Sequence, residues 1–299
     1  MFDIVDVETQ IADHESMAAL HARMNGPLNQ MNENLKTMKD HFERSKREGI
    51  LFWISSQPYH QHHEQMKKGF VRGTGQWLLQ DPVFQNWKDG RTSSILQLHG
   101  IPGSAKSKLA SVVIEDAISL FKESESPSPA FFYCSRNPAE PERSYPEAIL
   151  AGIVRQLSCF DVGYPLLKPL IQKYESRLQT PFPSLRLSIK ESCELIIEVT
   201  ESYLVVTIVI DALDECSRNK SLDFLEALET ILSRATQLVK IFVSSRDDQD
   251  IVWSLKHYPN LRISSTRNME DISTFVRTVV ESLIRRAAAN GQLEVATTF

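Results

Sequence analysis

The chain is poor in cysteine and glycine and lacks any long apolar run. Of its 299 residues, 11 are glycine and four are cysteine. The cysteines are Cys134, Cys159, Cys193 and Cys216. Because none of them forms a Cys-x-x-Cys pair, we expect buried, reduced thiols and neither a disulfide framework nor a zinc site. The longest apolar run, residues 204–210, is far shorter than the roughly 18 residues that span a bilayer.

An excess of positive charge is also missing. The sequence has 33 basic and 38 acidic side chains, which gives a formal net charge of −5. No global field would therefore attract nucleic acid or an anionic membrane. The N-terminus is acidic and interrupted by polar residues, whereas a signal peptide needs a basic start and an apolar stretch. These absences predict a cytoplasmic protein that binds no nucleic acid and has no membrane span.

What is present is the composition of an ordinary globular protein. Apolar residues make up 42% of the chain and charged residues 24%. At about 150 residues per domain, the length suggests two domains, although one large α/β unit also fits.

Residues 1–48 are predicted to be helical and similar to a coiled coil. One apolar stripe at helical spacing consists of Met17, Leu20 and Met24. We expect Gly26-Pro27 to end that helix. A second stripe, which steps by three and four residues, consists of Leu28, Met31, Leu35, Met38 and Phe42. The stripe is open to two interpretations: a coupling or oligomerisation element, or a helix packed on its own domain.

Residues 49–90 are rich in aromatic side chains and irregular in pattern, so we expect a compact connector. His60, His62 and His63 lie close together there. Apart from Glu64, no cysteine or carboxylate stands at ligand spacing, so the sequence favours a solvated loop over a metal site.

From residue 91 to 288, apolar runs alternate with amphipathic stretches, which predicts a mostly parallel sheet covered on both faces. The expected strands are 95–99, 130–134, 205–211, 239–245 and 261–264. The expected helices are 106–121, 146–160, 187–202, 222–236 and 269–286, with another at 166–178.

A glycine loop follows the first expected strand and opens a helix. Its residues are Gly100, Ile101, Pro102, Gly103, Ser104, Ala105, Lys106 and Ser107. Apart from Ala105, it matches the phosphate-binding pattern GxxxxGK[ST]. Backbone N–H groups and the helix N-terminus would face the phosphates, Lys106 would reach the β and γ phosphates, and Ser107 would ligate Mg²⁺. The methyl group of Ala105 could crowd those phosphates. A plain β-turn capped onto a helix is the alternative.

Two further strands end in polar residues. Residues 205–210 lead directly into Asp211, with Asp214 and Glu215 close behind. Such acids at the carboxyl end of a central strand are placed to hold Mg²⁺ and to polarise an attacking water. Asp214 could instead cap the next helix. Arg246 follows the strand at 239–245, where its guanidinium could contact a γ-phosphate.

Four segments together carry a resemblance to a known family. They are residues 100–107, FFYCSR at 131–136, IVIDALDEC at 208–216 and KIFVSSRDD at 240–248. They resemble the nucleotide-binding domain of fungal NACHT-type STAND proteins, which are signalling ATPases related to immune receptors. The region from about 50 to 286 is also similar to the nephrocystin 3-like N-terminal domain family. That stretch includes the Arg72-Gly-Thr-Gly turn before the first strand.

The resemblance implies an α/β P-loop NTPase with a three-layer fold that binds ATP or ADP with Mg²⁺. It implies Lys106 and Ser107 at the phosphates and metal, and Asp211 at the metal. Asp214 and Glu215 would be catalytic and Arg246 a sensor. Thr74 and Gly75 would border the adenine, unless their turn only leads into a helix. Gly100, Gly103, Ser104 and Ala105 would complete the nucleotide loop.

Three functions remain open. The first is an ATP-dependent conformational switch with slow hydrolysis, whose N-terminal helices bind protein partners or a second copy. The second is a degenerate P-loop scaffold with weak or no turnover, which Ala105 favours. The third is a small-molecule kinase. The acids at 211–215 argue against it, because they suit the activation of water. Residues 289–299 are expected to be a tail, without the lid and sensor regions of the family.

Overall fold

The computed structural model describes residues 4–71, 73–123, 128–159, 166–180 and 186–289, with the backbone alone at 4–24, 121–123, 265–267 and 287–289. The chain divides into two units, Met1–Phe52 and Trp53–Phe299. In the described part of the chain, no helix combines the length and the apolar character that crossing a bilayer requires.

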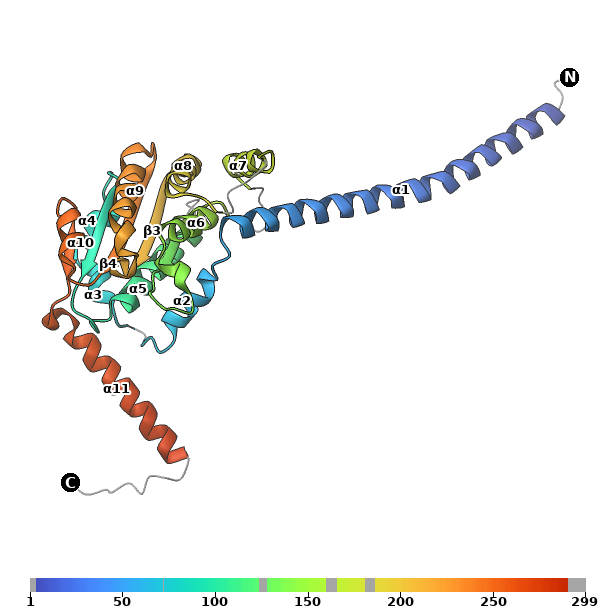
Figure 1. Ribbon diagram of the computed structural model, residues 1–299. Helices are drawn as coiled ribbons and strands as arrows, with labels where there is room; N and C mark the ends of the chain where they lie inside the picture. The colour runs from blue at the N-terminus through green and yellow to red at the C-terminus, as the bar shows by residue number, and fades with distance from the viewer. Residues whose placement is uncertain (1–3, 72, 124–127, 160–165, 181–185, 290–299) are drawn as a thin grey trace. The chain divides into compact units, whose positions relative to one another are not determined.

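The first unit consists of one long helix. Helix α1 spans Ile4–Ile54 and runs through Pro27 without ending (Figure 1). The predicted break at Gly26-Pro27 is therefore wrong. A proline inside a helix loses one backbone hydrogen bond, but its φ angle is helical, and long helical stretches on both sides propagate past it.

The second unit contains a five-stranded sheet in the order β2-β3-β4-β1-β5, with every neighbouring pair parallel. The strands are β1 Ser94–His99, β2 Ala130–Tyr133, β3 Val205–Asp211, β4 Leu238–Ser245 and β5 Asn260–Arg262. All five expected strands are confirmed to within two residues at their ends. Wholly apolar runs such as 241–243 form them because both faces of the sheet are covered.

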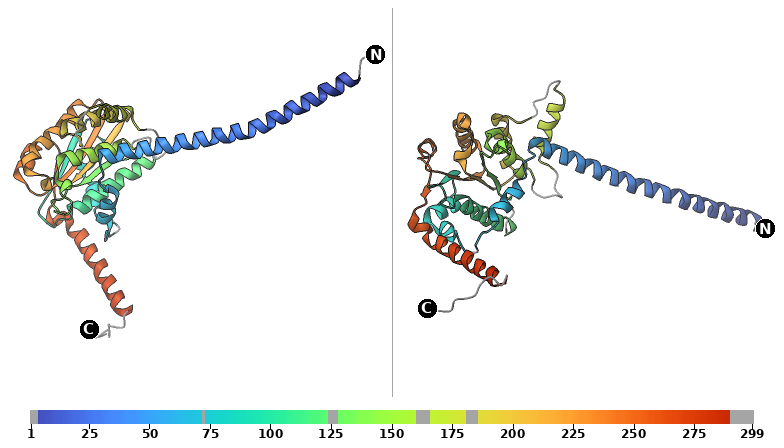
Figure 2. Two further views of the ribbon diagram at one scale, coloured as in Figure 1. Left: turned by 45° about the vertical axis from the view of Figure 1, so that its right-hand side comes forward. Right: turned by 60° about the horizontal axis from the view of Figure 1, so that its bottom comes forward.

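Helices cover both faces of this sheet (Figures 1 and 2). The covering helices include α5 Lys106–Glu123, α6 Pro146–Leu157, α8 Ile189–Thr200 and α9 Ser221–Arg234. The unit also contains α7 Lys168–Leu178, α10 Gln249–Ser254 and α11 Ser265–Ala289. On one face α8 contacts both α6 and α9, and on the other α5 packs with the segment before β1. The six expected helices are confirmed, although Phe160 and the tail at 290–299 lie outside the described residues.

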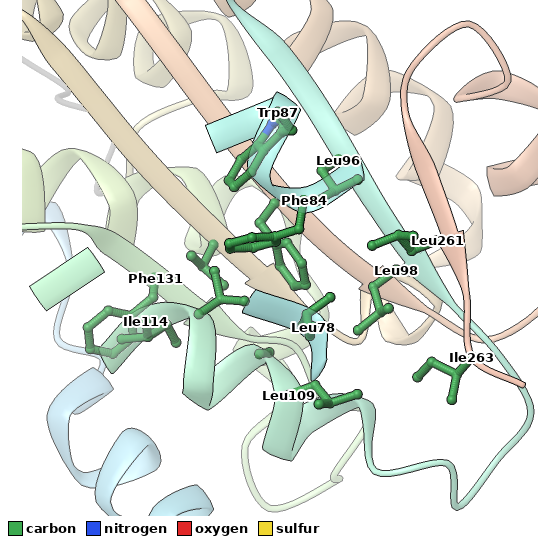
Figure 3. Close-up of a cluster of buried hydrophobic side chains, with 14 of the residues drawn as sticks. Leu78, Phe84, Trp87, Leu96, Leu98, Leu109, Ile114, Phe131, Leu261 and Ile263 are labelled. Carbon is green, nitrogen blue, oxygen red and sulfur yellow. The ribbon is translucent and has the colours of Figure 1, made fainter. Parts of the chain in front are cut away.

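The segment expected to be an irregular connector is mostly helical. It forms α2 Tyr59–Lys67, α3 Gln76–Gln80 and α4 Pro82–Asp89. Leu78, Phe84 and Trp87 from this segment are buried with Leu96 of β1 and Leu109 of α5 (Figure 3). Residues 76–89 therefore belong to the core of the sheet domain. Helices of five to nine residues have too few turns to show a clear apolar period in the sequence.

The expected solvated histidine loop is likewise wrong for two of its three residues. His62 and His63 are buried on α2. His63 contacts the Tyr133 hydroxyl at 2.8 Å and a Glu115 carboxylate oxygen at 2.8 Å, and His62 lies 3.0 Å from Glu140. Partners from distant segments satisfy these rings, which the local sequence could not reveal. Among the described residues, no group of three or more His, Cys, Asp or Glu is placed to hold a metal ion.

Three of the four cysteines, Cys134, Cys193 and Cys216, are buried as expected, and Cys159 is half-buried. Burial raises the pKa of the Cys193 thiol to about 11 and that of Cys216 to about 12. Thiols with such high pKa values are poor nucleophiles at neutral pH.

Candidate functional site

The site lies at the carboxyl edge of the sheet, where three neighbouring strands end together. In the register of the sheet, His99 of β1 is beside Ser245 of β4, and Ile210 of β3 is beside Val243. The glycine loop, Asp211 and Arg246 therefore leave the sheet at the same edge. This is the edge at which open parallel sheets bind ligands.

The glycine loop connects β1 to α5, so the N-terminus of this 18-residue helix lies at the end of the loop. Gly103 has φ +79° and Ala105 has φ +63°. Glycine takes such left-handed angles freely, whereas an alanine there costs roughly 1 kcal/mol. Ala105 therefore adopts a backbone conformation that favours glycine and adds a methyl group to the loop.

Lys106 lies over this loop. Its Nζ donates to the carbonyl oxygens of Gly100 at 2.9 Å and Ile101 at 2.8 Å, with the Ser104 hydroxyl at 3.4 Å. Burial lowers the pKa of the Lys106 amine, and the nearby carboxylates of Asp214 and Asp211 oppose that shift. The amine is thus held among the backbone groups of the loop.

Asp211 is buried at the end of β3 and lies against the start of α5. Its carboxylate accepts hydrogen bonds from the hydroxyls of Ser244 and Ser107. Burial raises the pKa of Asp211, although these hydrogen bonds oppose the shift. The structure thus brings together a carboxylate and a hydroxyl, two of the oxygen ligands that Mg²⁺ accepts alongside water and phosphate.

Asp214 and Glu215 lie in a short 3₁₀ turn after β3 and contact Arg246. Asp214 Oδ1 accepts from the Arg246 backbone N–H at 2.9 Å, and Oδ2 lies 3.2 Å from its Nε. Glu215 Oε1 is 3.4 Å from Arg246 Nη2. Asp214 does not cap the next helix, because Lys220 is the N-cap of α9.

Arg136 is a residue of this site that the sequence analysis did not select. Its backbone N–H donates to Glu215 Oε2 at 3.0 Å, and its guanidinium donates to the carbonyl oxygens of Asp214 and Cys216. It stands just past β2 in the FFYCSR segment. The rule that selected Arg246, a charged residue after an apolar strand, could also have found it.

A pocket of about 260 Å³ adjoins the glycine loop. Thr74 and Gly75 line it from one side, and Gly103 and Ala105 from the loop. Its volume is at the small end of ligand pockets. Gly75 has φ +77°, and a Cβ there would stand 2.9 Å from Val112 Cγ2, so only glycine fits. Arg72, which precedes this turn, lies outside the described residues.

Helix α11 closes the same pocket. Ile272 and Phe275 line it. Asn268 Nδ2 donates to the Ser104 carbonyl oxygen at 3.1 Å, and Asp271 Oδ2 accepts from the Gly75 N–H at 2.8 Å. The sequence pattern does not reveal these four residues, because their roles depend on how α11 packs. The pocket therefore has apolar walls and a backbone loop, and two hydrogen bonds hold α11 to residues that line or adjoin it.

Comparisons with known proteins agree with this geometry. Residues 73–246 match the family described as nephrocystin 3, N-terminal. The vegetative incompatibility protein HET-E-1 of Podospora anserina is 28% identical over 229 residues, which cover 75% of this chain and 16% of that protein. The chain thus spans less than a fifth of that relative's length.

Solved structures with a similar arrangement are more distant. The ORC1 protein of Aeropyrum pernix in complex with DNA has a TM-score of 0.45 at 16% identity, over 70% of this chain and 50% of that one. The Walker-type ATPase PABY2304 of Pyrococcus abyssi has a TM-score of 0.41 at 13% identity, over 72% and 59%.

Proposed function

The chain belongs to the nephrocystin 3 N-terminal family of NACHT-type P-loop NTPases, and on that premise we propose that it binds ATP and ADP with Mg²⁺ and acts as a conformational switch. Slow ATP hydrolysis accompanies the switch. The observation that carries the proposal is the meeting of Lys106, Ser107 and Asp211 at one edge of the sheet.

The phosphates bind in the loop 100–107. Their negative charge meets the Lys106 amine and the N-terminus of α5, which carries about half a positive charge. When bound, Mg²⁺ supplies Lewis acidity at the phosphate oxygens. Ser107 and Asp211 would hold it, since hydroxyl and carboxylate oxygens suit this ion and no described residue group competes for a softer metal.

Asp214, Glu215 and Arg246 are the proposed catalytic and sensing residues. Asp214 makes two contacts with Arg246, whereas Glu215 has one at 3.4 Å. A γ-phosphate would compete with these carboxylates for the Arg246 guanidinium. That competition supplies the difference in binding free energy between two arrangements that a switch requires. Arg136 positions the turn that carries both acids.

The adenine occupies the pocket beside Thr74 and Gly75. Its apolar walls suit a flat base, and Gly103 and Ala105 of the phosphate loop line it too. Because Ile272 and Phe275 of α11 form part of the wall, a bound base would also stabilise the docking of α11.

Thermal melting with Mg²⁺-ATP or Mg²⁺-ADP tests this function. Nucleotide at a hundred times its Kd should stabilise the protein by about 2.7 kcal/mol. The Lys106→Ala variant should show no shift with nucleotide relative to its own ligand-free melting temperature. Lys190→Ala, an exposed lysine on α8, is the matched control and should keep the shift.

The second candidate is a scaffold that shares the fold without nucleotide turnover. The left-handed Ala105 favours it, because its methyl group stands in the phosphate loop. A folded protein whose melting temperature ignores millimolar nucleotide would contradict the switch and leave the scaffold. If the shift appears, single-turnover hydrolysis with Glu215→Gln beside Asp214→Asn separates the roles of the two acids.

A further inference from the structure

Helix α1 carries a narrow, exposed apolar seam. We define the seam as Leu28, Met31, Leu35, Met38 and Phe42. Each of these side chains is between 50% and 68% exposed. Their spacing alternates three and four residues, which places them at successive a and d positions of heptads. The other ten residues from 28 to 42 are all polar. Two apolar residues per heptad are the pattern of a coiled-coil seam.

The continuity of α1 makes the seam longer than the sequence alone suggested. Because the helix continues through Pro27, the heptad register of the seam also continues toward the N-terminus. In that register Met17 and Met24 take d positions and His21 takes an a position. Positions 17 to 42 thus form one pattern of eight a and d positions, seven of them apolar. A pattern broken at Gly26-Pro27 would offer only five.

The width of the seam indicates what kind of surface fits it. Helix α11 provides a contrast, since eight of its sixteen residues from Met269 to Ile284 are large, apolar and at least 37% exposed. A face that wide suits the core of a globular assembly. A membrane surface also requires a wide apolar face flanked by basic residues. The seam of α1 is two residues wide, which fits another helix with the same 3.5-residue repeat.

The charges beside the seam allow a copy of the same helix. In a parallel pair, the g position of one helix faces the next e position of the other. Asn34 then faces Lys39, and His41 faces Lys46, so no two formal like charges oppose each other at neutral pH. We propose that α1 pairs with α1 of a second copy of this chain, in a two-stranded coiled coil along positions 17–42. The pairing depends on the seam and not on nucleotide.

The mass of the full chain in solution tests the pairing. Light scattering after size-exclusion chromatography, without nucleotide and over a wide range of concentration, should give twice the 34.0 kDa of one chain. The seam variant Leu35→Glu with Met38→Glu should give the single-chain mass. The matched control Gln30→Glu with Thr37→Glu adds the same charges at c positions and should remain a dimer. Equal melting temperatures of the two variants would show that the seam variant still folds.

Lys106→Ala separates this inference from the proposed function. It removes the proposed phosphate contact and should leave the dimer intact. A wild-type chain that stays at 34.0 kDa at every concentration would overturn the inference. So would a dimer that survives in the seam variant, or a dimer that Lys106→Ala dissociates.

Discussion

Two lysine amines at opposite edges of the sheet, one half-buried and one buried, make the same kind of contact for different purposes. At the carboxyl edge, Lys106 donates to the carbonyl oxygens of Gly100 and Ile101. At the amino edge, Lys240 of β4 donates to those of Trp87 at 2.6 Å and Thr92 at 2.9 Å. Burial lowers the pKa of both lysines.

The two lysines differ in what surrounds them. Lys106 stands at the N-terminus of α5 with the carboxylates of Asp211 and Asp214 nearby, on a loop of backbone groups. Lys240 is 2% exposed and ties the end of α4 to the sheet. A cavity of about 290 Å³ adjoins Lys240, and the pocket beside the glycine loop is lined by Lys108. A cavity beside a lysine therefore does not mark a nucleotide site, whereas a helix N-terminus with a buried carboxylate beside it points to one.

The largest expected effect is on the amino edge. Replacement of Lys240 by methionine leaves the carbonyl oxygens of Trp87 and Thr92 without a donor, at about 1–3 kcal/mol each. Relief from burying a charge offsets part of this, so we expect the unfolding free energy to fall by about 3 kcal/mol. Urea denaturation should show the same loss with and without Mg²⁺-ATP. Lys190→Met on the surface is the control, and a loss that nucleotide reverses would break the distinction between the edges.

At the carboxyl edge, Asp211→Asn should abolish the stabilisation by nucleotide without lowering the stability of the ligand-free protein. The raised pKa shows that the folded protein disfavours the ionised carboxylate. The amide keeps an acceptor for Ser244 without the charge, so the ligand-free melting temperature should stay the same or rise. The stabilisation by Mg²⁺-nucleotide, about 2.7 kcal/mol at a hundred times Kd, should disappear. A ligand-free protein that becomes much less stable would instead give Asp211 a structural role like that of Lys240.

Ala105→Gly should stabilise the protein by up to about 1 kcal/mol. Glycine removes the steric strain that alanine has in the left-handed backbone at φ +63°. The greater conformational entropy of glycine in the unfolded chain offsets part of this gain in stability. Ala110→Gly in the interior of α5 is the matched control and should destabilise by about 1 kcal/mol or more. Chemical denaturation of both variants checks the sign, and a loss of stability from Ala105→Gly would contradict strain in the loop.

The smallest effect concerns a carboxylate with the opposite pKa shift. Burial raises the pKa of Glu191, but the Ser188 N–H and hydroxyl, Arg177 and Lys173 outweigh it and lower the pKa to about 2. A carboxyl group whose pKa is lower in the folded than in the unfolded chain stabilises the folded state at pH values above the unfolded pKa. For Glu191 that contribution is lost as pH falls from about 4.5 to about 2. Glu191→Gln should cost a few tenths of a kcal/mol at pH 7 and flatten the acid titration of stability in that window. Asp211, which lacks the lowered pKa, should give no such loss.

Much of the fold could be predicted because its signals are local. Strands such as 205–211 are apolar on both faces, and each ends in polar residues that the next turn needs. Lys106, Ser107, Asp211 and Arg246 could be selected one by one, since each follows an apolar strand or opens a helix. Their roles at phosphate and metal stay predictions until nucleotide is measured.

The misses have a common physical cause. His63 is polar in sequence and buried in the structure because Tyr133 and Glu115 come to it from other elements. Arg136 and Asn268 act through contacts with residues 78 to 164 positions away. No local pattern carries such contacts, because hydrogen-bond partners across a sheet depend on strand order.

The sequence by itself determined the alternation of strands and helices, the phosphate-loop pattern and the acids that follow β3, because these depend on neighbours a few residues apart. Only the tertiary structure decided that β4 lies between β3 and β1, which brings Arg246 to Asp214 and Ser244 to Asp211. It also decided that α11 closes the pocket at Gly75 and that α1 continues through Pro27. The physical reason is that packing draws its free energy from many distant contacts at once. Helix propagation past a proline draws on the turns on both sides of it, so a short stretch of sequence encodes neither.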